Sequence, residues 1–209
     1  MYSVFSNVRT IGDFFRSLKW AWQRATKGYC DLDTYGVGDW FLNTLPDMLE
    51  SIKNNRVGFP SVLLEEGIAH YGLKSMDEYN AASEELRDKI DDYGNEKWSE
   101  ILSRLIFLLR EANEDTCTKV NPYDEEYIRI SEEFCAKYGE WGEKLLTDEE
   151  KAEAKKTGSH PVYLPHQMPE YKEICELHFE EERKLNAYRE QCKNEALELF
   201  STWFYSLGF

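Results

Sequence analysis

The sequence predicts an all-α protein, a compact helical core with a long antiparallel helical hairpin insertion. Two observations favour this class. Apolar residues recur every three to four positions along almost the whole chain, and the alternation typical of strands is nearly absent. Gly and Pro residues, together with Ser or Thr followed three positions later by Glu, punctuate the chain where helices should end and begin.

The first helix is expected from about Ile11 to Ala25, and Gly28 should end it in a left-handed conformation. Five apolar residues share one face of this helix. They are Ile11, Phe14, Phe15, Leu18 and Trp22. The second helix should begin after Asp33 or Thr34, because either side chain can accept backbone N–H groups as an N-cap.

The second helix is expected to bend at Pro46, since Pro removes one backbone hydrogen bond. Its inward-facing residues are then Trp40, Phe41, Leu45, Met48, Leu49 and Ile52. A short helix over 62–71 follows. The next helix opens with a capping box at 75–78 and ends before Gly94. The most apolar helix, 97–112, should be buried on most sides.

Residues 121–190 are expected to form the hairpin. Asn121 and Pro122 are typical of an N-cap and the first residue of a helix. Residues 147–150 (TDEE) indicate another capping box, and a Pro-rich segment precedes a last helix over about 169–206.

The domain organisation follows from these elements. Residues 1–120 and 191–209 should form the helical core, with 121–190 inserted as the helical hairpin. The sequence contains no internal repeat.

The chain of 209 residues carries a formal net charge of −15 and is rich in aromatic residues. The aromatic content indicates a packed globule, and the negative field argues against direct nucleic-acid binding. The first 28 residues differ, because they hold five basic side chains against the single Asp13. The basic residues are Arg9, Arg16, Lys19, Arg24 and Lys27.

The cysteines are scattered and form no CxxC pair, so reduced thiols are expected, with neither a disulfide framework nor a zinc site. They are Cys30, Cys117, Cys135, Cys175 and Cys192. The N-terminus lacks the basic start and apolar run of a signal peptide, and no segment approaches the roughly 18 apolar residues that cross a bilayer. No membrane partner is expected, and a bacterial cytoplasm is the simplest location.

Several blocks of the sequence, in order and spacing, resemble small phage-encoded or prophage-encoded helical proteins of unassigned function. Residues 18–29 (LKWAWQRATKGY) and 31–35 (DLDTY) resemble an aromatic-basic helix that ends in an R-G-[WY]-x-D-x-D-x-W turn. The further matching blocks are Asp39-Trp40, Leu45-Pro46 in a Leu-Pro helix, 58–60 for a Gly-Tyr-Pro block, 98–102 for a W-x-x-I-L helix and 195–204 for a terminal helix.

This resemblance implies a viral origin and a host cytoplasmic location, but it carries no assigned activity. The chain departs from the pattern in three places. Tyr35 stands where Trp is usual, and Val37-Gly38 replace Asn-Leu. Residues 113–190 are longer than the connection expected in the family.

The region from residue 24 to 40 is the best candidate ligand site. The candidate ligand-binding residues are Trp20, Arg24, Lys27, Tyr29, Asp31, Asp33 and Trp40. Arg or Lys would hold a phosphate, an aromatic ring would stack a base, and Asp would take ribose hydroxyls. The structural alternative assigns the same residues to a helix stop, helix caps and core, and it is favoured because no phosphate-binding glycine motif accompanies them.

No motif for catalysis or metal binding is present. His160, His166 and His178 show no HExxH or i, i+4 pair, so a core or interfacial role is favoured over a metal site. No G-x-S-x-G elbow occurs either. Catalytic residues, a metal and a cofactor are therefore not expected.

Acidic residues concentrate in 64–92 and 180–182. The favoured interpretation is a solvated helix face. The alternative is a patch that imitates nucleic-acid charge and occupies a basic groove of a host protein.

The sequence therefore favours a phage-encoded, non-enzymatic binding protein that antagonises host antiviral defence by sequestering a nucleotide-derived signal. The alternatives are an acidic protein–protein inhibitor of a host nuclease or defence effector, and a metal-dependent helical hydrolase. The aromatic heptads in 121–146 and 169–190 should pair with each other or form a homodimer.

Overall fold

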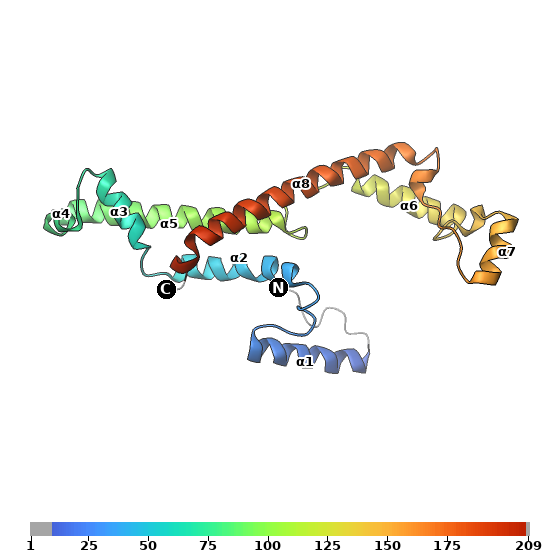
Figure 1. Cartoon of the computed structure of the whole chain (residues 1–209), viewed down its shortest axis with the longest axis horizontal. Helices are drawn as coiled ribbons and strands as arrows, with labels where there is room; N and C mark the ends of the chain where they lie inside the picture. The colour runs from blue at the N-terminus through green and yellow to red at the C-terminus, as the bar shows by residue number, and fades with distance from the viewer. Residues whose placement is uncertain (1–9, 208–209) are drawn as a thin grey trace. The chain divides into compact units, whose positions relative to one another are not determined.

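The computed structural model describes residues 10–207, and within this range the chain is all-α, as predicted (Figure 1). The α-helices are α1 (Ile11–Lys27), α2 (Val37–Asn55), α3 (Ser61–His70), α4 (Met76–Ala81), α5 (Glu84–Ala112), α6 (Asp124–Tyr138), α7 (Asp148–Thr157) and α8 (Lys172–Trp203). Short 3₁₀ segments occupy Glu143–Leu145, Pro165–Gln167 and Phe204–Ser206. None of the helices in this range has an apolar stretch long enough to span a membrane.

The chain divides into two units, and α8 contributes to both. The first unit contains Met1–Cys117 with Arg189–Phe209, and the second contains Thr118–Tyr188.

The core of the first unit forms where α2 and α3 pack along α5. Its buried apolar side chains recur at helical spacing on α5, as expected for a helix enclosed on several sides. The principal members are Leu49, Leu63, Ile68, Ile90, Trp98, Leu102, Leu105 and Leu109. The end of α8 joins this core through Trp203, whose ring centroid lies 5.4 Å from that of Trp98.

The core of the second unit is small and aromatic. Ile130 and Phe134 of α6 are buried against Tyr171 and Cys175. The side chains packed around this group are Tyr127, Tyr138, Leu145, Tyr163, Met168 and Ile174. The Tyr171 hydroxyl donates to Glu133 Oε1 at 3.0 Å, so the buried phenol has a hydrogen-bond partner.

Local signals at helix ends are confirmed. Gly28 follows α1 with φ 80°, a left-handed C-cap. Ser75 caps α4 by accepting from the Glu78 N–H, and Thr147 and Glu150 form the reciprocal capping box that starts α7. Short-range hydrogen bonds of this kind depend on neighbouring residues alone, which makes them predictable.

Gly94 does not end a helix, contrary to the prediction. The chain breaks earlier, between α4 and α5, where Ser83 accepts from the Leu86 N–H as the N-cap of α5. Helix α5 is 29 residues long and continues through Gly94. A Cβ at Gly94 would lie 2.2 Å from Cε2 of Phe59, so glycine is needed there for close packing.

The caps expected for α2 and α6 are also wrong. Helix α2 begins after Gly36 without a side-chain cap. The Asp33 carboxylate accepts hydrogen bonds from Arg24 and from the Cys30 N–H. Helix α6 begins after Tyr123. The side chain of Asn121 is buried, where its amide donates to the His178 carbonyl and to Glu182. Asn121 therefore joins α8 and keeps a local bond from the Tyr123 N–H.

Some apolar residues on α1 and α2 are exposed. Met48, placed in the core from its spacing, is 55% exposed on α2. The five apolar residues that share one face of α1 are all exposed. Three of the five free cysteines, Cys30, Cys175 and Cys192, are buried.

Candidate functional site

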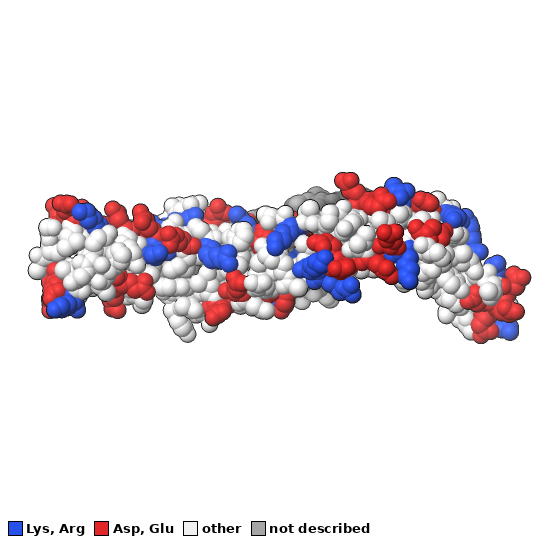
Figure 2. All heavy atoms as spheres, turned by 90° about the horizontal axis from the view of Figure 1, so that it is seen from above, with Lys and Arg blue, Asp and Glu red and all other residues white. Residues whose placement is uncertain are grey.

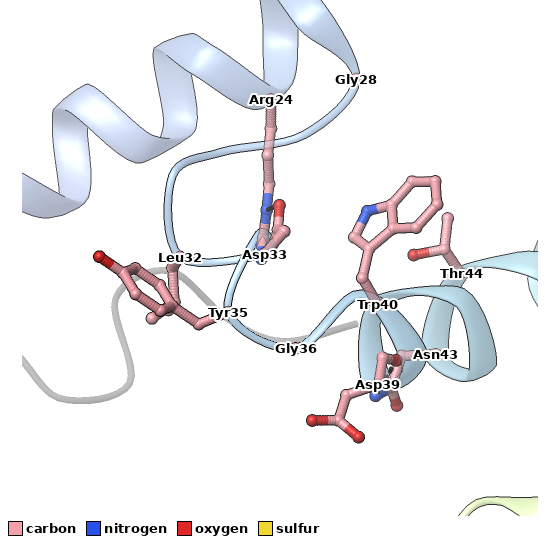
Figure 3. A pocket seen from close by; sticks show the side chains of 10 residues that line it. All are labelled: Arg24, Gly28, Leu32, Asp33, Tyr35, Gly36, Asp39, Trp40, Asn43 and Thr44. Atoms are coloured by element: carbon pink, nitrogen blue, oxygen red, sulfur yellow. Dashed lines mark hydrogen bonds and ion pairs between the residues drawn. The ribbon is translucent and has the colours of Figure 1, made fainter.

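A cavity of about 510 Å³ lies where the end of α1 and the following turn meet the first turns of α2 (Figure 3). The lining residues are Arg24, Gly28, Leu32, Asp33, Tyr35, Gly36, Asp39, Trp40, Asn43 and Thr44. The left-handed Gly28 reverses the chain after α1, with its N–H donating to the Arg24 carbonyl at 3.0 Å. Residues 29–36 can therefore run back alongside α1.

The turn is tied to α1 by an ion pair between Arg24 and Asp33. Arg24 Nε donates to Asp33 Oδ2 at 3.0 Å, and Nη2 donates to Oδ1 at 2.5 Å. Asp33 Oδ2 also accepts from the Cys30 N–H at 2.7 Å. The Arg24 guanidinium, and then the Cys30 N–H, hold the pKa of Asp33 at about 2 against a partly opposing effect of burial.

A second carboxylate in the turn also binds back to α1. Asp31 accepts from Lys19 Nζ at 2.7 Å and from Gln23 Nε2 at 2.8 Å, while its own N–H donates to Gln23 Oε1 at 3.0 Å. The hydrogen bond from Lys19 is the main cause that lowers the pKa of Asp31. Because Asp31 faces α1, it does not line the cavity.

The α2 side of the cavity combines an aromatic ring with polar groups. Figure 3 shows the half-buried indole of Trp40 projecting from the first turns of α2 beside the Arg24–Asp33 pair. Asn43 Nδ2 donates to the Asp39 carbonyl at 2.8 Å, and its Oδ1 accepts from Asn113 at 3.0 Å. Asn43 thus links the wall of the cavity to the end of α5.

The Asp39 carboxylate lies against the N-terminus of its own helix. Its Oδ2 is 2.8 Å from the position that a Cβ on Gly36 would occupy, so a side chain at residue 36 would displace it. A carboxylate here complements the helix dipole. It also places a negative charge where the exposed N–H groups of a helix start would otherwise attract an anion.

The structure brings together three of the seven residues selected from the sequence. Arg24, Asp33 and Trp40 line the cavity. The other four selected residues, Trp20, Lys27, Tyr29 and Asp31, do not line it. The role expected for Arg24 also changes, because its guanidinium is bound to Asp33 and is no longer an unshared phosphate ligand.

Sequence reasoning missed several lining residues. Asn43 and Thr44 follow Trp40 by three and four positions, so helical spacing alone places them on its face. Leu32 and Tyr35 carried no such signal, because their positions depend on the conformation of the turn.

The histidines singled out in the sequence do not form a metal centre. Across residues 10–207, no group of three or more His, Cys, Asp or Glu side chains is arranged to hold a metal ion. The His178 ring stacks on Tyr127 with centroids 4.0 Å apart, and its Nδ1 lies 3.1 Å from Asn121 Nδ2. His178 therefore takes part in packing within the second unit.

Each of the two acidic segments contains ion pairs with lysine side chains. Glu85 binds Lys89 at 2.6 Å, and Lys184 lies within 3.2 Å of both Glu180 and Glu181. Figure 2 shows basic side chains interspersed among acidic ones on the face drawn. Such pairing is typical of a solvated helix surface.

Comparison with protein families, with curated proteins and with solved structures finds no match for this chain. Functional inference therefore depends on the geometry of the cavity and on the residues around it.

Proposed function

We propose that this chain is a non-enzymatic binding protein that takes the nucleoside part of a small molecule into the cavity lined by Arg24, Asp33 and Trp40. The observation that carries the proposal is a cavity of about 510 Å³ with an indole in its wall. This volume is within the range of small-molecule sites, which combine aromatic surface with a few polar groups. Given the resemblance to phage-encoded proteins, binding would withdraw a nucleotide-derived signal from host defence.

The chemistry of the wall favours a nucleoside over a phosphate group. The rings of Trp40 and Tyr35 offer surfaces on which a base can stack. The Asp39 carboxylate can accept hydrogen bonds from ribose hydroxyls. Arg24 is matched by Asp33, so the charged lining residues, one Arg and two Asp, leave one negative charge. We therefore place any phosphate groups of the ligand outside the cavity.

Isothermal titration calorimetry with adenosine, guanosine, and cyclic and linear dinucleotides tests the proposal. We expect saturable binding of at least one nucleoside-containing compound, and its loss in Trp40→Ala, since the stacking surface is removed. Trp141→Ala is the matched control, because it removes an exposed indole from the other unit. No binding to the whole panel by folded protein, or equal binding by Trp40→Ala, would overturn the proposal.

The Asp39 carboxylate provides a second, independent test. Asp39→Asn removes the negative charge beside the start of α2 while keeping the size of the side chain. We expect the affinity for a nucleotide relative to its nucleoside to rise on the order of fivefold, the effect of one partly screened charge a few ångströms away. An unchanged ratio would contradict the proposal that the Asp39 carboxylate keeps phosphate groups out of the cavity.

A further inference from the structure

Helix α1 presents its apolar face to solvent. Its five large apolar residues are between 43% and 78% exposed, namely Ile11, Phe14, Phe15, Leu18 and Trp22. The residues buried on this helix are polar instead, Ser17 and Gln23. A surface helix normally buries its apolar stripe, so this face requires a cover that residues 10–207 of the same chain do not supply.

We propose that the cover is a second copy of α1, and that two chains pair through this helix in antiparallel orientation. The spacing of the stripe fits a coiled-coil seam. Ile11, Leu18 and Ala25 are seven residues apart, and Phe14 and Ala21 each follow three positions after the first two. This is the a and d pattern of two paired helices.

The distribution of side-chain size along the stripe favours the antiparallel orientation. At the a and d positions, the large residues Ile11, Phe14 and Leu18 stand in the first half of the helix, and Ala21 and Ala25 stand in the second half, with Trp22 beside the seam. An antiparallel pair sets Phe14 against Ala25 and Leu18 against Ala21, so large side chains meet small ones. A parallel pair would set Phe against Phe and Ala against Ala, and would leave unfilled space at one end.

Charge also favours a second copy of the chain as the occupant. Residues 10–35 hold four basic and three acidic side chains, a balance of +1 in a chain of net charge −15. Two copies therefore repel each other least where this segment forms the contact. Lys19 and Arg24, which flank the stripe, are already paired with Asp31 and Asp33. An anionic bilayer would need unmatched basic residues in these positions.

The exposed area is sufficient for a reversible dimer. The five large side chains expose on the order of 600 Å² per copy, or roughly 1,200 Å² for two copies, which is the lower end of specific interfaces. We therefore expect a dimer that dissociates on dilution. The stripe and the cavity at Trp40 are separate features, so dimer formation does not depend on the proposed ligand.

Sedimentation velocity from about 1 to about 100 µM tests the dimer. We expect the wild-type chain to shift from 24.7 kDa to a species of twice that mass as concentration rises. Leu18→Glu would bury two like charges at the seam and should raise the dissociation constant at least about tenfold. Leu197→Glu is the matched control, because Leu197 on α8 is also 43% exposed. If circular dichroism shows that Leu18→Glu does not fold, Trp22→Gln is tested in its place.

Wild-type protein that stays monomeric throughout, or equal effects of the two glutamate substitutions, would overturn the proposal. So would a dimer that forms only after residues 1–9 are removed, since the cover would then be the chain's own N-terminus. Cosedimentation of monomer with phosphatidylserine vesicles, lost in Leu18→Glu, would assign the stripe to a lipid surface instead.

Disulfide cross-linking tests the orientation in a Cys135→Ser background, because Cys135 is an exposed thiol. Phe14→Cys and Ala25→Cys chains are mixed and oxidised. A mixed disulfide between the two variants supports the antiparallel pair. Disulfides that form only within each variant show a parallel pair and overturn the orientation.

Discussion

The guanidinium of Arg24 and the carboxylate of Asp33 form a two-point ion pair between the last turn of α1 and the turn that leads into α2 (Figure 3). The side chains are 23% and 8% exposed, whereas those of the Lys19–Asp31 pair are both more than half exposed. Loss of one partner from a shielded pair leaves an uncompensated charge away from water. The Arg24–Asp33 pair therefore holds the turn that forms one wall of the cavity.

Asp33→Asn should destabilise the protein by about 1–3 kcal/mol, because Arg24 loses its charged partner in a partly buried position. Urea denaturation followed by circular dichroism measures the change. Asp31→Asn is the matched control, and we expect it to have little effect, since its pair with Lys19 is exposed to solvent. Equal destabilisation by the two substitutions would contradict a special role for Asp33.

The same pair should make stability depend on pH in acid. The pKa of Asp33 is about 2 in the folded chain, below its ordinary value of 3.8, mainly because Arg24 donates to the carboxylate. A group with a lowered folded pKa contributes stability that is fully present above pH 3.8 and is lost as the pH falls toward 2. The difference in unfolding free energy between wild type and Asp33→Asn should therefore shrink over that window. A difference that stays constant would show that the carboxylate is not stabilised by its charge.

The parts of the fold that were predictable depend on local sequence. Helical periodicity predicted the all-α class, since apolar spacing reflects which face of each helix is buried. The capping box at Thr147 and the left-handed Gly28 were predictable for the same reason. The role of Gly94 was not predictable. A glycine is required there by Phe59, which is distant in the sequence.

The candidate site was partly predictable for a related reason. Arg24, Asp33 and Trp40 carry charge or aromatic surface within one short segment, and the structure places all three around one cavity. The bond between Arg24 and Asp33 depends on how the intervening turn folds, which composition does not reveal. Hydrophobic periodicity also identified the α1 stripe, but periodicity does not say which surface covers it.

Gly94→Ala should destabilise the first unit even though Ala is the better helix former. The intrinsic gain is about 1 kcal/mol. The new Cβ would lie 2.2 Å from the Phe59 ring, and relieving that overlap should cost about 1–3 kcal/mol beyond the gain.

Thermal and urea unfolding of Gly94→Ala measure the net effect. Gly38→Ala on α2 is the control, because a Cβ there meets nothing within 4 Å and should leave stability equal or higher. Combining Gly94→Ala with Phe59→Leu should recover part of the loss, since the smaller side chain leaves room. An additive double variant would contradict direct contact as the cause.

Asn121→Ala should destabilise the second unit by about 2 kcal/mol, because the hydrogen bonds of a buried amide side chain are lost. The Asn121 side chain is 5% exposed. Its amide donates to the His178 carbonyl at 3.0 Å and to Glu182 Oε1 at 3.1 Å, and its Oδ1 accepts from the Tyr123 N–H at 3.0 Å. Hydrogen exchange should accordingly quicken in α6.

The control for this prediction is Asn55→Ala. Asn55 also hydrogen-bonds a backbone carbonyl, that of Ser51 at 2.8 Å, but it is exposed, so water can replace the lost bond. We expect a change within about 0.5 kcal/mol for Asn55→Ala. If Asn121→Ala were equally mild, the side chain would act only as a local turn residue before α6, which is the role that its position before Pro122 suggested. A large loss confined to Asn121→Ala would instead show that one buried amide joins the start of α6 to α8.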